Sequence, residues 1–72
     1  MAVPQHRRIL GQTLRELRER ARLTQERLAE KAELNPKYVS EVERGNVNVS
    51  LDALARVAKA LGIRVHDLTR RI

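Results

Sequence analysis

Four polar side chains between residues 37 and 44 could form hydrogen bonds with nucleic-acid bases or with phosphate groups. They are Lys37, Ser40, Glu41 and Arg44. Lysine can donate to guanine O6 and N7, serine can bond to several base edges, and a carboxylate can accept from the amino group of cytosine. At helical spacing these residues share one face. The pattern therefore predicts a polar helix surface able to read a DNA groove.

Each of these side chains also has a plainer interpretation. Lys37 is the first candidate for base recognition, because it lies in the first turn of a predicted helix, but a phosphate contact suits it nearly as well. A carboxylate near DNA is repelled, so Glu41 could instead hold a neighbouring Lys or Arg in place. Tyr38 could contact phosphate or simply pack at the edge of the core. The sequence leaves these alternatives open.

A polar loop follows this helix and carries Asn46 and Asn48. Together with Arg44 at the helix end, these side chains could hold the phosphate backbone, as loops in this position commonly do. The alternative is a solvent-exposed turn. Phosphate contacts here would make DNA affinity strongly dependent on salt.

The elements that position these residues are two short helices that meet at a sharp turn. The first is predicted over residues 25–32 with Thr24 as its N-cap, and the second over residues 36–44. Asn35 caps the second helix, Pro36 suits its first position, and Gly45 can end it. Apolar residues at helical spacing give each helix an inward face. Such a unit, with its second helix displayed, is a helix-turn-helix, which is used to read the major groove.

Three further helices are predicted around this unit. Residues 1–5 are expected to form a flexible arm, and residues 6–22 a helix with an inward stripe and surface ion pairs from Arg15 to Glu19 and from Glu16 to Arg20. Gly11 is expected to weaken that helix by about 1 kcal/mol. Its polar residues Arg7, Arg8 and Gln12 could contact phosphate or form a solvated face.

The C-terminal part predicts a helix over residues 51–61, capped by Ser50 and ended by Gly62, and a short helix over residues 65–70. The inward stripe of the first is predicted from Leu51, Leu54, Ala55, Ala58 and Leu61, with Val57 widening it. Leu68 is expected to point inward from the second. The fold class is therefore all-α, one five-helix domain over residues 6–72.

Composition excludes several classes of function. The chain has 72 residues, a net charge of +6, one aromatic residue and no cysteine, so neither a disulfide nor a thiolate metal site can form. The two histidines, His6 and His66, lack ligand spacing, and no catalytic constellation is visible. We expect no metal, no cofactor and no enzyme activity. With no apolar run long enough for a membrane, a cytoplasmic, nucleoid-associated protein is expected.

Four segments are together typical of one family. They are LRELR at 14–18, LTQERLAEKA at 23–32, YVSEVERG at 38–45 and SLDALARVAKALGI at 50–63. Over about residues 9–70 the chain resembles the lambda-repressor-like, Cro/C1-type (XRE) helix-turn-helix family. The resemblance implies a compact five-helix domain that binds operator DNA, usually as a dimer. It looks most like the stand-alone controller proteins of restriction–modification systems, with phage Cro-like regulators and antitoxins as alternatives.

The resemblance also implies roles for individual residues. Gln25 matches a residue that contacts phosphate and braces the recognition helix, and Arg18 with Glu43 matches a partly buried salt bridge between the first helix and that helix. Two positions depart from the family pattern. Glu33 replaces the glycine usual in the turn, and Pro36 replaces a polar residue, leaving only apolar contact with a thymine methyl group.

These observations predict a sequence-specific transcriptional regulator that binds double-stranded DNA. It would bind a palindromic operator as a homodimer, with helix 36–44 in the major groove, and block or contact RNA polymerase. The candidates for the dimer interface are apolar residues near the C-terminus: Leu61, Ile63, Val65, Leu68 and Ile72. The alternative is an antitoxin-type interaction module that neutralises a toxin and binds DNA secondarily.

Overall fold

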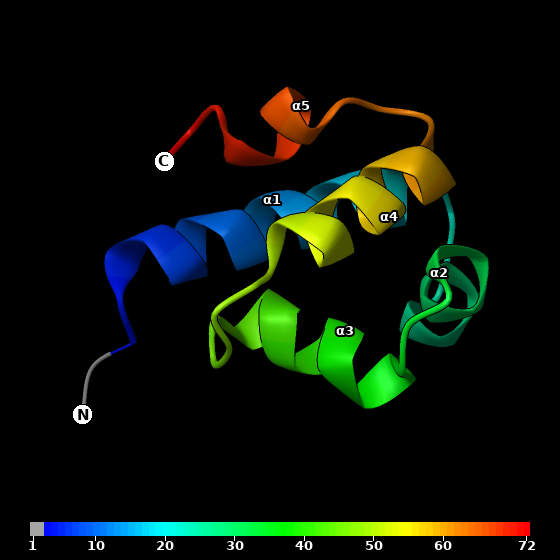
Figure 1. Ribbon diagram of the computed structural model, residues 1–72, viewed down its shortest axis with the longest axis horizontal. Coiled ribbons are helices and arrows are strands. Elements are labelled where there is room, and N and C mark those ends of the chain that lie inside the picture. The colour runs from blue at the N-terminus through cyan, green and yellow to red at the C-terminus, as the bar shows by residue number, and fades with distance from the viewer. Residues whose placement is uncertain (1–2) are drawn as a thin grey trace.

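Five helices, and no strand, form residues 3–72, the part of the chain that this computed structural model describes. They are α1 (Gln5–Arg20), α2 (Gln25–Ala32), α3 (Pro36–Arg44), α4 (Leu51–Leu61) and α5 (Val65–Thr69), coloured in chain order in Figure 1. The predicted all-α class and all five helices are confirmed.

The N-terminal arm is shorter than predicted. Residues 1–2 of the arm lie outside the described residues, and Gln5 already belongs to α1, because Pro4 acts as its N-cap residue. At the other end, α1 stops at Arg20, two residues before the predicted end, and Arg22 adopts a left-handed conformation with φ 61°. That turn directs the chain into α2.

Local hydrogen bonds set the starts of α2, α3 and α4. The side-chain oxygens of Thr24, Asn35 and Ser50 each accept a hydrogen bond from a backbone N–H two or three residues on, at 3.0, 2.8 and 3.0 Å. Gly45 and Gly62 end α3 and α4 in the left-handed region, with φ 78° and 69°. All five of these predicted boundary roles are confirmed.

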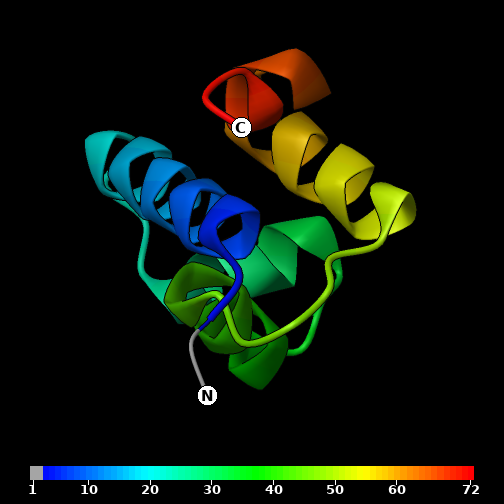
Figure 2. The same cartoon turned by 90° about the vertical axis from the view of Figure 1, so that its left-hand side faces the viewer.

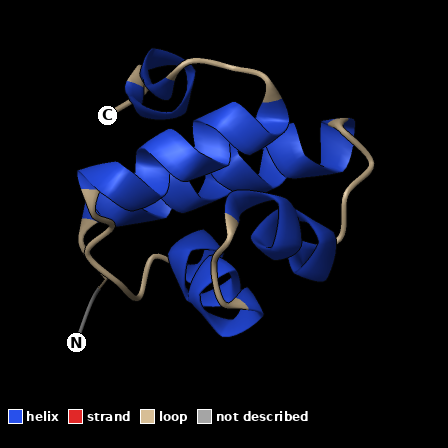
Figure 3. Cartoon of the chain, turned by 45° about the vertical axis from the view of Figure 1, so that its right-hand side comes forward, coloured by secondary structure: helices blue, strands red, loops and turns tan. Residues whose placement is uncertain are grey.

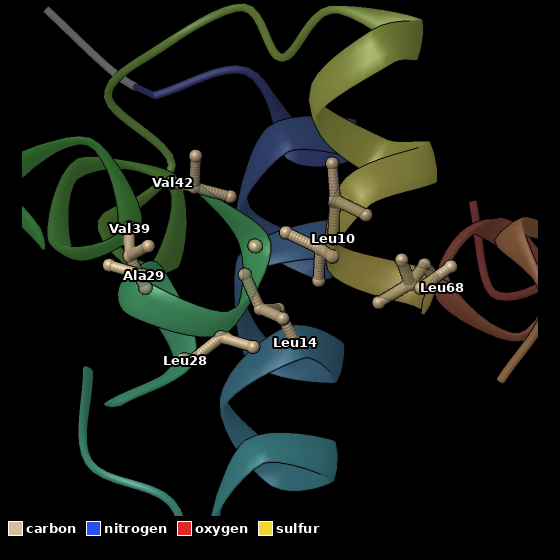
Figure 4. Close-up of a cluster of buried hydrophobic side chains, with 10 residues drawn as sticks. Leu10, Leu14, Leu28, Ala29, Val39, Val42 and Leu68 are labelled. Atoms are coloured by element: carbon tan, nitrogen blue, oxygen red, sulfur yellow. The ribbon is translucent and has the colours of Figure 1, made fainter. Parts of the chain in front are cut away.

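The helices surround one apolar core. Seen from the side in Figure 2, α1 and α4 stand on opposite sides, α5 closes the top, and α2 and α3 lie below. Figure 3 shows the same arrangement from another side, with α5 above the long helices. Buried leucines, valines and alanines from all five helices meet in the centre, several of which Figure 4 labels. In the described residues no helix is long and apolar enough to cross a membrane.

The inward stripe of α4 differs from the prediction. Ala53, Val57 and Ala58 are buried, whereas Leu51 is 70% exposed and Ala55 is exposed. The apolar residues of α4 extend around more than half of the helix, so periodicity alone leaves the orientation of the stripe open. Contact with α2 and α5 selects the side that carries Ala53 and Val57.

Leu68 belongs to the core of a single copy. Its side chain is 0% exposed, because α5 packs on both α1 and α4 and places Leu68 between them. The prediction that Leu68 contributes to a dimer interface is therefore wrong. Its predicted inward orientation is confirmed.

Gly11 allows α1 to cross α3 in backbone contact. A Cβ atom at this position would lie 2.5 Å from the carbonyl oxygens of both Val42 and Glu43, closer than real Cβ atoms approach. The glycine that weakens α1 as an isolated helix is therefore required for its packing on α3. The local cost of Gly11 can be predicted from the sequence, whereas its contact with α3 cannot.

Two surface ion pairs connect residues of α1, one within the helix and one to the end of the chain. Arg15 pairs with Glu19 at 3.3 Å, as predicted. Glu16 pairs with Arg71 at 2.8 Å in place of the predicted Arg20. The Arg71 guanidinium lowers the pKa of Glu16 below its ordinary value, mainly through this hydrogen bond.

Candidate nucleic-acid interface

Helix α3 rests on the core through one side and displays the other. Val39 and Val42 are buried against α1 and α2, while Pro36, Lys37 and Arg44 are exposed. Ser40 and Glu41 are half-buried. In Figure 1, α3 forms the lower edge of the molecule, where a large ligand can approach. Tyr38 is half-buried and packs against the core, which agrees with the packing interpretation of this residue.

The turn between α2 and α3 forms without the usual glycine. Glu33 adopts the left-handed conformation, with φ 57° and ψ 45°, and the Leu34 N–H donates to the Ala29 carbonyl at 2.8 Å. A non-glycine residue costs about 1 kcal/mol in this conformation. The sharp turn predicted from the sequence is therefore present, and Glu33 departs from the family pattern in residue type alone.

A hydrogen-bond network at Glu43 connects α1, α2 and α3. The Arg18 guanidinium donates from Nε and Nη2 to the two carboxylate oxygens of Glu43, at 2.6 and 3.1 Å. Gln25, at the start of α2, donates from Nε2 to Glu43 Oε1 at 3.0 Å. Arg18 also donates from Nη1 to the Leu23 carbonyl at 2.7 Å. The network fixes the orientation of α3 relative to the other two helices.

This network is largely removed from water. The side chains of Arg18 and Glu43 are 11% and 4% exposed. The hydrogen bond that the guanidinium donates to Glu43 raises the pKa of Arg18 above its ordinary value. The predicted salt bridge and the bracing by Gln25 are both observed, and the phosphate contact of Gln25 stays a prediction.

Glu41 binds the two polar residues that follow it around the end of α3. Its carboxylate accepts from Arg44 Nη1 at 3.4 Å and from Asn46 Nδ2 at 3.1 Å. The Asn46 backbone N–H donates to the Glu41 carbonyl at 3.0 Å, which joins the loop to the last turn of the helix. Asn48 lies exposed further along this loop.

The segment before α1 covers the end of α3, an arrangement that the sequence analysis missed. A Cβ atom on Gly45 would lie 2.8 Å from Val3 Cγ1 and 3.2 Å from the Arg8 backbone. Figure 2 shows this segment beside the loop that follows α3. The carbonyl-rich end of α3 thus lies beside the first turn of α1, which carries Arg7 and Arg8 and no acidic residue. The sequence carries no separate signal for this contact, because the glycine at position 45 is already explained by its role in ending α3.

A displayed helix with a polar face, set by a sharp turn and a buried salt bridge, defines a DNA-binding helix-turn-helix domain. Comparison with known proteins agrees with this class. Residues 9–71 match a family model described as a helix-turn-helix domain, and the chain belongs to this family. The predicted class, a helix-turn-helix DNA-binding regulator, is confirmed.

Two curated relatives have names that describe control functions. Control protein C.BamHI of Bacillus amyloliquefaciens is 41% identical over 63 residues, which is 86% of this chain and 78% of that protein. The immunity repressor protein of Bacillus phage phi105 is 46% identical over 56 residues, 78% of this chain. This chain spans only 39% of the length of that repressor.

The crystal structure of the restriction-modification controller protein C.AhdI from Aeromonas hydrophila is similar in fold and sequence. The TM-score is 0.85 and the sequence identity is 45%, over 86% of this chain and 94% of that chain. The predicted resemblance to controller proteins is thereby confirmed.

Proposed function

We propose that the protein regulates transcription by binding a palindromic operator in double-stranded DNA as a homodimer, with α3 in the major groove. The observation that carries the proposal is the displayed polar face of α3, held in one orientation by the buried Arg18–Glu43 pair. A rigidly positioned helix is suited to base recognition, because hydrogen bonds to base edges tolerate little displacement.

Base contacts and phosphate contacts come from different parts of this surface. Lys37 and Ser40 read base edges from the first half of α3, and Pro36 offers an apolar contact to a thymine methyl group. Phosphate contacts come from residues at helix ends and in the loop: Gln25, Arg44, Asn46 and Asn48. Glu41 lies between the two groups.

Dimerisation uses the C-terminal part of the chain. Leu61, Ile63 and Val65 are half-buried against the core, and Ile72 is 55% exposed. A two-fold axis here places two α3 helices about 34 Å apart, one turn of DNA. One copy measures only 31 Å along its longest axis, which supports a second copy for the second half-site.

The regulatory role follows that of controller proteins. Those named C.BamHI and C.AhdI are similar to this chain over most of its length. We infer that the protein acts on the nucleoid in the cytoplasm. Bound to a promoter, it blocks RNA polymerase, or contacts the polymerase when bound just upstream.

Selection from a random pool of duplex DNA at moderate salt tests this function. We expect an enriched palindrome with half-sites one turn apart, and a complex of two copies per duplex by sedimentation. Lys37→Ala and Ser40→Ala should lose the enrichment while keeping the melting temperature, since both residues lie on the displayed face. Binding that is blind to sequence and vanishes with salt would contradict the proposal.

A further inference from the structure

Glu41 is an acidic residue on a surface that is otherwise suited to binding phosphate. The other carboxylate of α3, Glu43, has its charge balanced by Arg18 in a buried pair. Glu41 is different, because its side chain is 26% exposed and lies toward the end of the displayed face. Its negative charge is therefore close to any DNA backbone that approaches Arg44 and the following loop.

The hydrogen bonds of Glu41 occupy the groups that would hold that backbone. Arg44 donates to one carboxylate oxygen and Asn46 to the other. Both are phosphate contacts in the proposed function, and both are engaged by an internal anion when no DNA is bound. The bond from the Asn46 N–H to the Glu41 carbonyl keeps the loop in reach of the carboxylate.

The charges of Glu41 and Arg44 determine how strongly this surface attracts phosphate. Arg44 is 66% exposed and would otherwise be a free cation at the DNA surface. Paired with Glu41, it forms a cluster with no net charge, so a phosphate gains less attraction there and also meets the carboxylate. Sequence-independent DNA affinity comes essentially from such phosphate contacts.

We propose that Glu41 limits the sequence-independent DNA affinity of the protein by competing with phosphate for Arg44 and Asn46. This inference rests on the proposed function in taking DNA as the ligand and Arg44 and Asn46 as its phosphate contacts. Glu41 acts through Arg44 and Asn46 and is a positioning residue. The base contacts of Lys37 and Ser40 are then needed to reach tight binding, because the backbone contacts alone are weakened.

The test measures binding of the full chain to a short duplex of mixed sequence over a series of salt concentrations. Glu41→Gln keeps an oxygen that can accept from Asn46 and removes only the charge. We expect its affinity for this duplex to rise about three- to ten-fold at low salt. The slope of log affinity against log salt should become steeper by about one, as for one additional neutralised phosphate.

Two further variants separate competition from net charge. Glu19→Gln removes an acidic partner from a similar exposed pair with Arg15 on α1, at 3.3 Å, and changes the net charge equally. It should leave the affinity and the slope nearly unchanged. In an Arg44→Gln background, Glu41→Gln should raise the DNA affinity much less, because the guanidinium for which Glu41 and phosphate compete is absent.

Several results would overturn the proposal. One is an increase in DNA affinity from Glu41→Gln that is no larger than the increase from Glu19→Gln. The others are an increase that is undiminished in the Arg44→Gln background, and a decrease in DNA affinity. The duplex in this test contains no operator. Failure to enrich a palindrome in the selection experiment would therefore contradict the proposed function, while the effect of Glu41→Gln on affinity could still be measured. Melting temperatures of all variants establish that each is folded.

Discussion

Glu43 shows how a single buried carboxylate can determine the orientation of a recognition helix. It accepts hydrogen bonds from Arg18 on α1 and from Gln25 on α2, and it belongs to α3 itself. A buried ion pair adds little net stability, because desolvation offsets much of the attraction between the charges. Removing one partner is different, since the other charge then stays buried without compensation.

We predict that Arg18→Ala lowers the free energy of unfolding by about 3–5 kcal/mol, because it strands the Glu43 carboxylate. Urea denaturation followed by circular dichroism measures this loss. Arg15→Ala, which breaks an exposed pair, should cost at most about 1 kcal/mol. The double variant Arg18→Met with Glu43→Leu should be more stable than Arg18→Ala alone. An unchanged melting temperature for Arg18→Ala would contradict the assignment.

The surface ion pair between Glu16 and Arg71 should be detectable through the pKa of the Glu16 carboxyl group. The folded-state pKa of Glu16 lies below the ordinary value of 4.5, mainly because of the hydrogen bond from Arg71. The pair's contribution to stability is therefore complete above the unfolded-state pKa and is lost as pH falls through the folded-state pKa. We predict that Arg71→Gln raises the pKa of Glu16 in an NMR titration. Arg20→Gln, which removes a weaker influence, should raise it less, and equal shifts would argue against the pair.

At the scale of elements, the crossing of α1 over α3 depends on the absence of one side chain. Gly11 brings the α1 backbone against the carbonyl oxygens at the end of α3, where Gly45 also contacts the segment before α1. The last turn of α3 is therefore held by backbone contacts on one side and by the Glu43 network on the other. This is also the turn that carries Arg44 into the loop.

We predict that Gly11→Ala destabilises the protein, although alanine favours helix formation by about 1 kcal/mol over glycine. The added methyl group would overlap backbone atoms that cannot rotate away, so a net loss of about 1–3 kcal/mol in the free energy of unfolding is expected. Thermal or urea denaturation measures it. Gln12→Ala, exposed on the same helix, should change stability by less than about 0.5 kcal/mol. A stabilised Gly11→Ala variant would show that the two helices can separate without cost.

For the molecule as a whole, charge and size set how it can meet DNA. The chain carries a net charge of +6 in a body with a Cα radius of gyration of 10.9 Å. Such a charge density attracts duplex DNA of any sequence. In the proposed function, one α3 face covers one half-site, so specific binding depends on a second copy and on base contacts.

We predict that affinity for the selected operator falls about a thousand-fold or more between about 50 and 200 mM salt, as expected for six or more phosphate contacts in the dimer. Fluorescence anisotropy at several salt concentrations measures the slope. The melting temperature should change little over the same range, because the exposed ion pairs contribute little stability. An affinity insensitive to salt would argue against phosphate contacts by Arg44 and the loop.

Much of the fold could be predicted from the sequence because its signals are local. The caps at Thr24, Asn35 and Ser50 act over two or three residues, and Gly45 and Gly62 need only their own backbone freedom. The family motifs extended this to the Arg18–Glu43 pair, which joins residues far apart in the chain. The α3 side chains proposed to meet DNA were likewise recognisable, since they share one helical face.

Other features depended on which surfaces pack together, and local patterns do not contain that information. Leu51 is 70% exposed because of where α4 packs, although its helical spacing predicted that it would face inward. Gly11 reads as a weak point until α3 lies against it, and Glu16 meets Arg71 across 55 residues of sequence. The sequence by itself determined the helices, most of their boundaries and the class of protein, because short-range hydrogen bonds and periodicity govern them. The tertiary structure alone decided which side of α4 is buried, because packing selects among apolar stripes that the chain leaves equivalent.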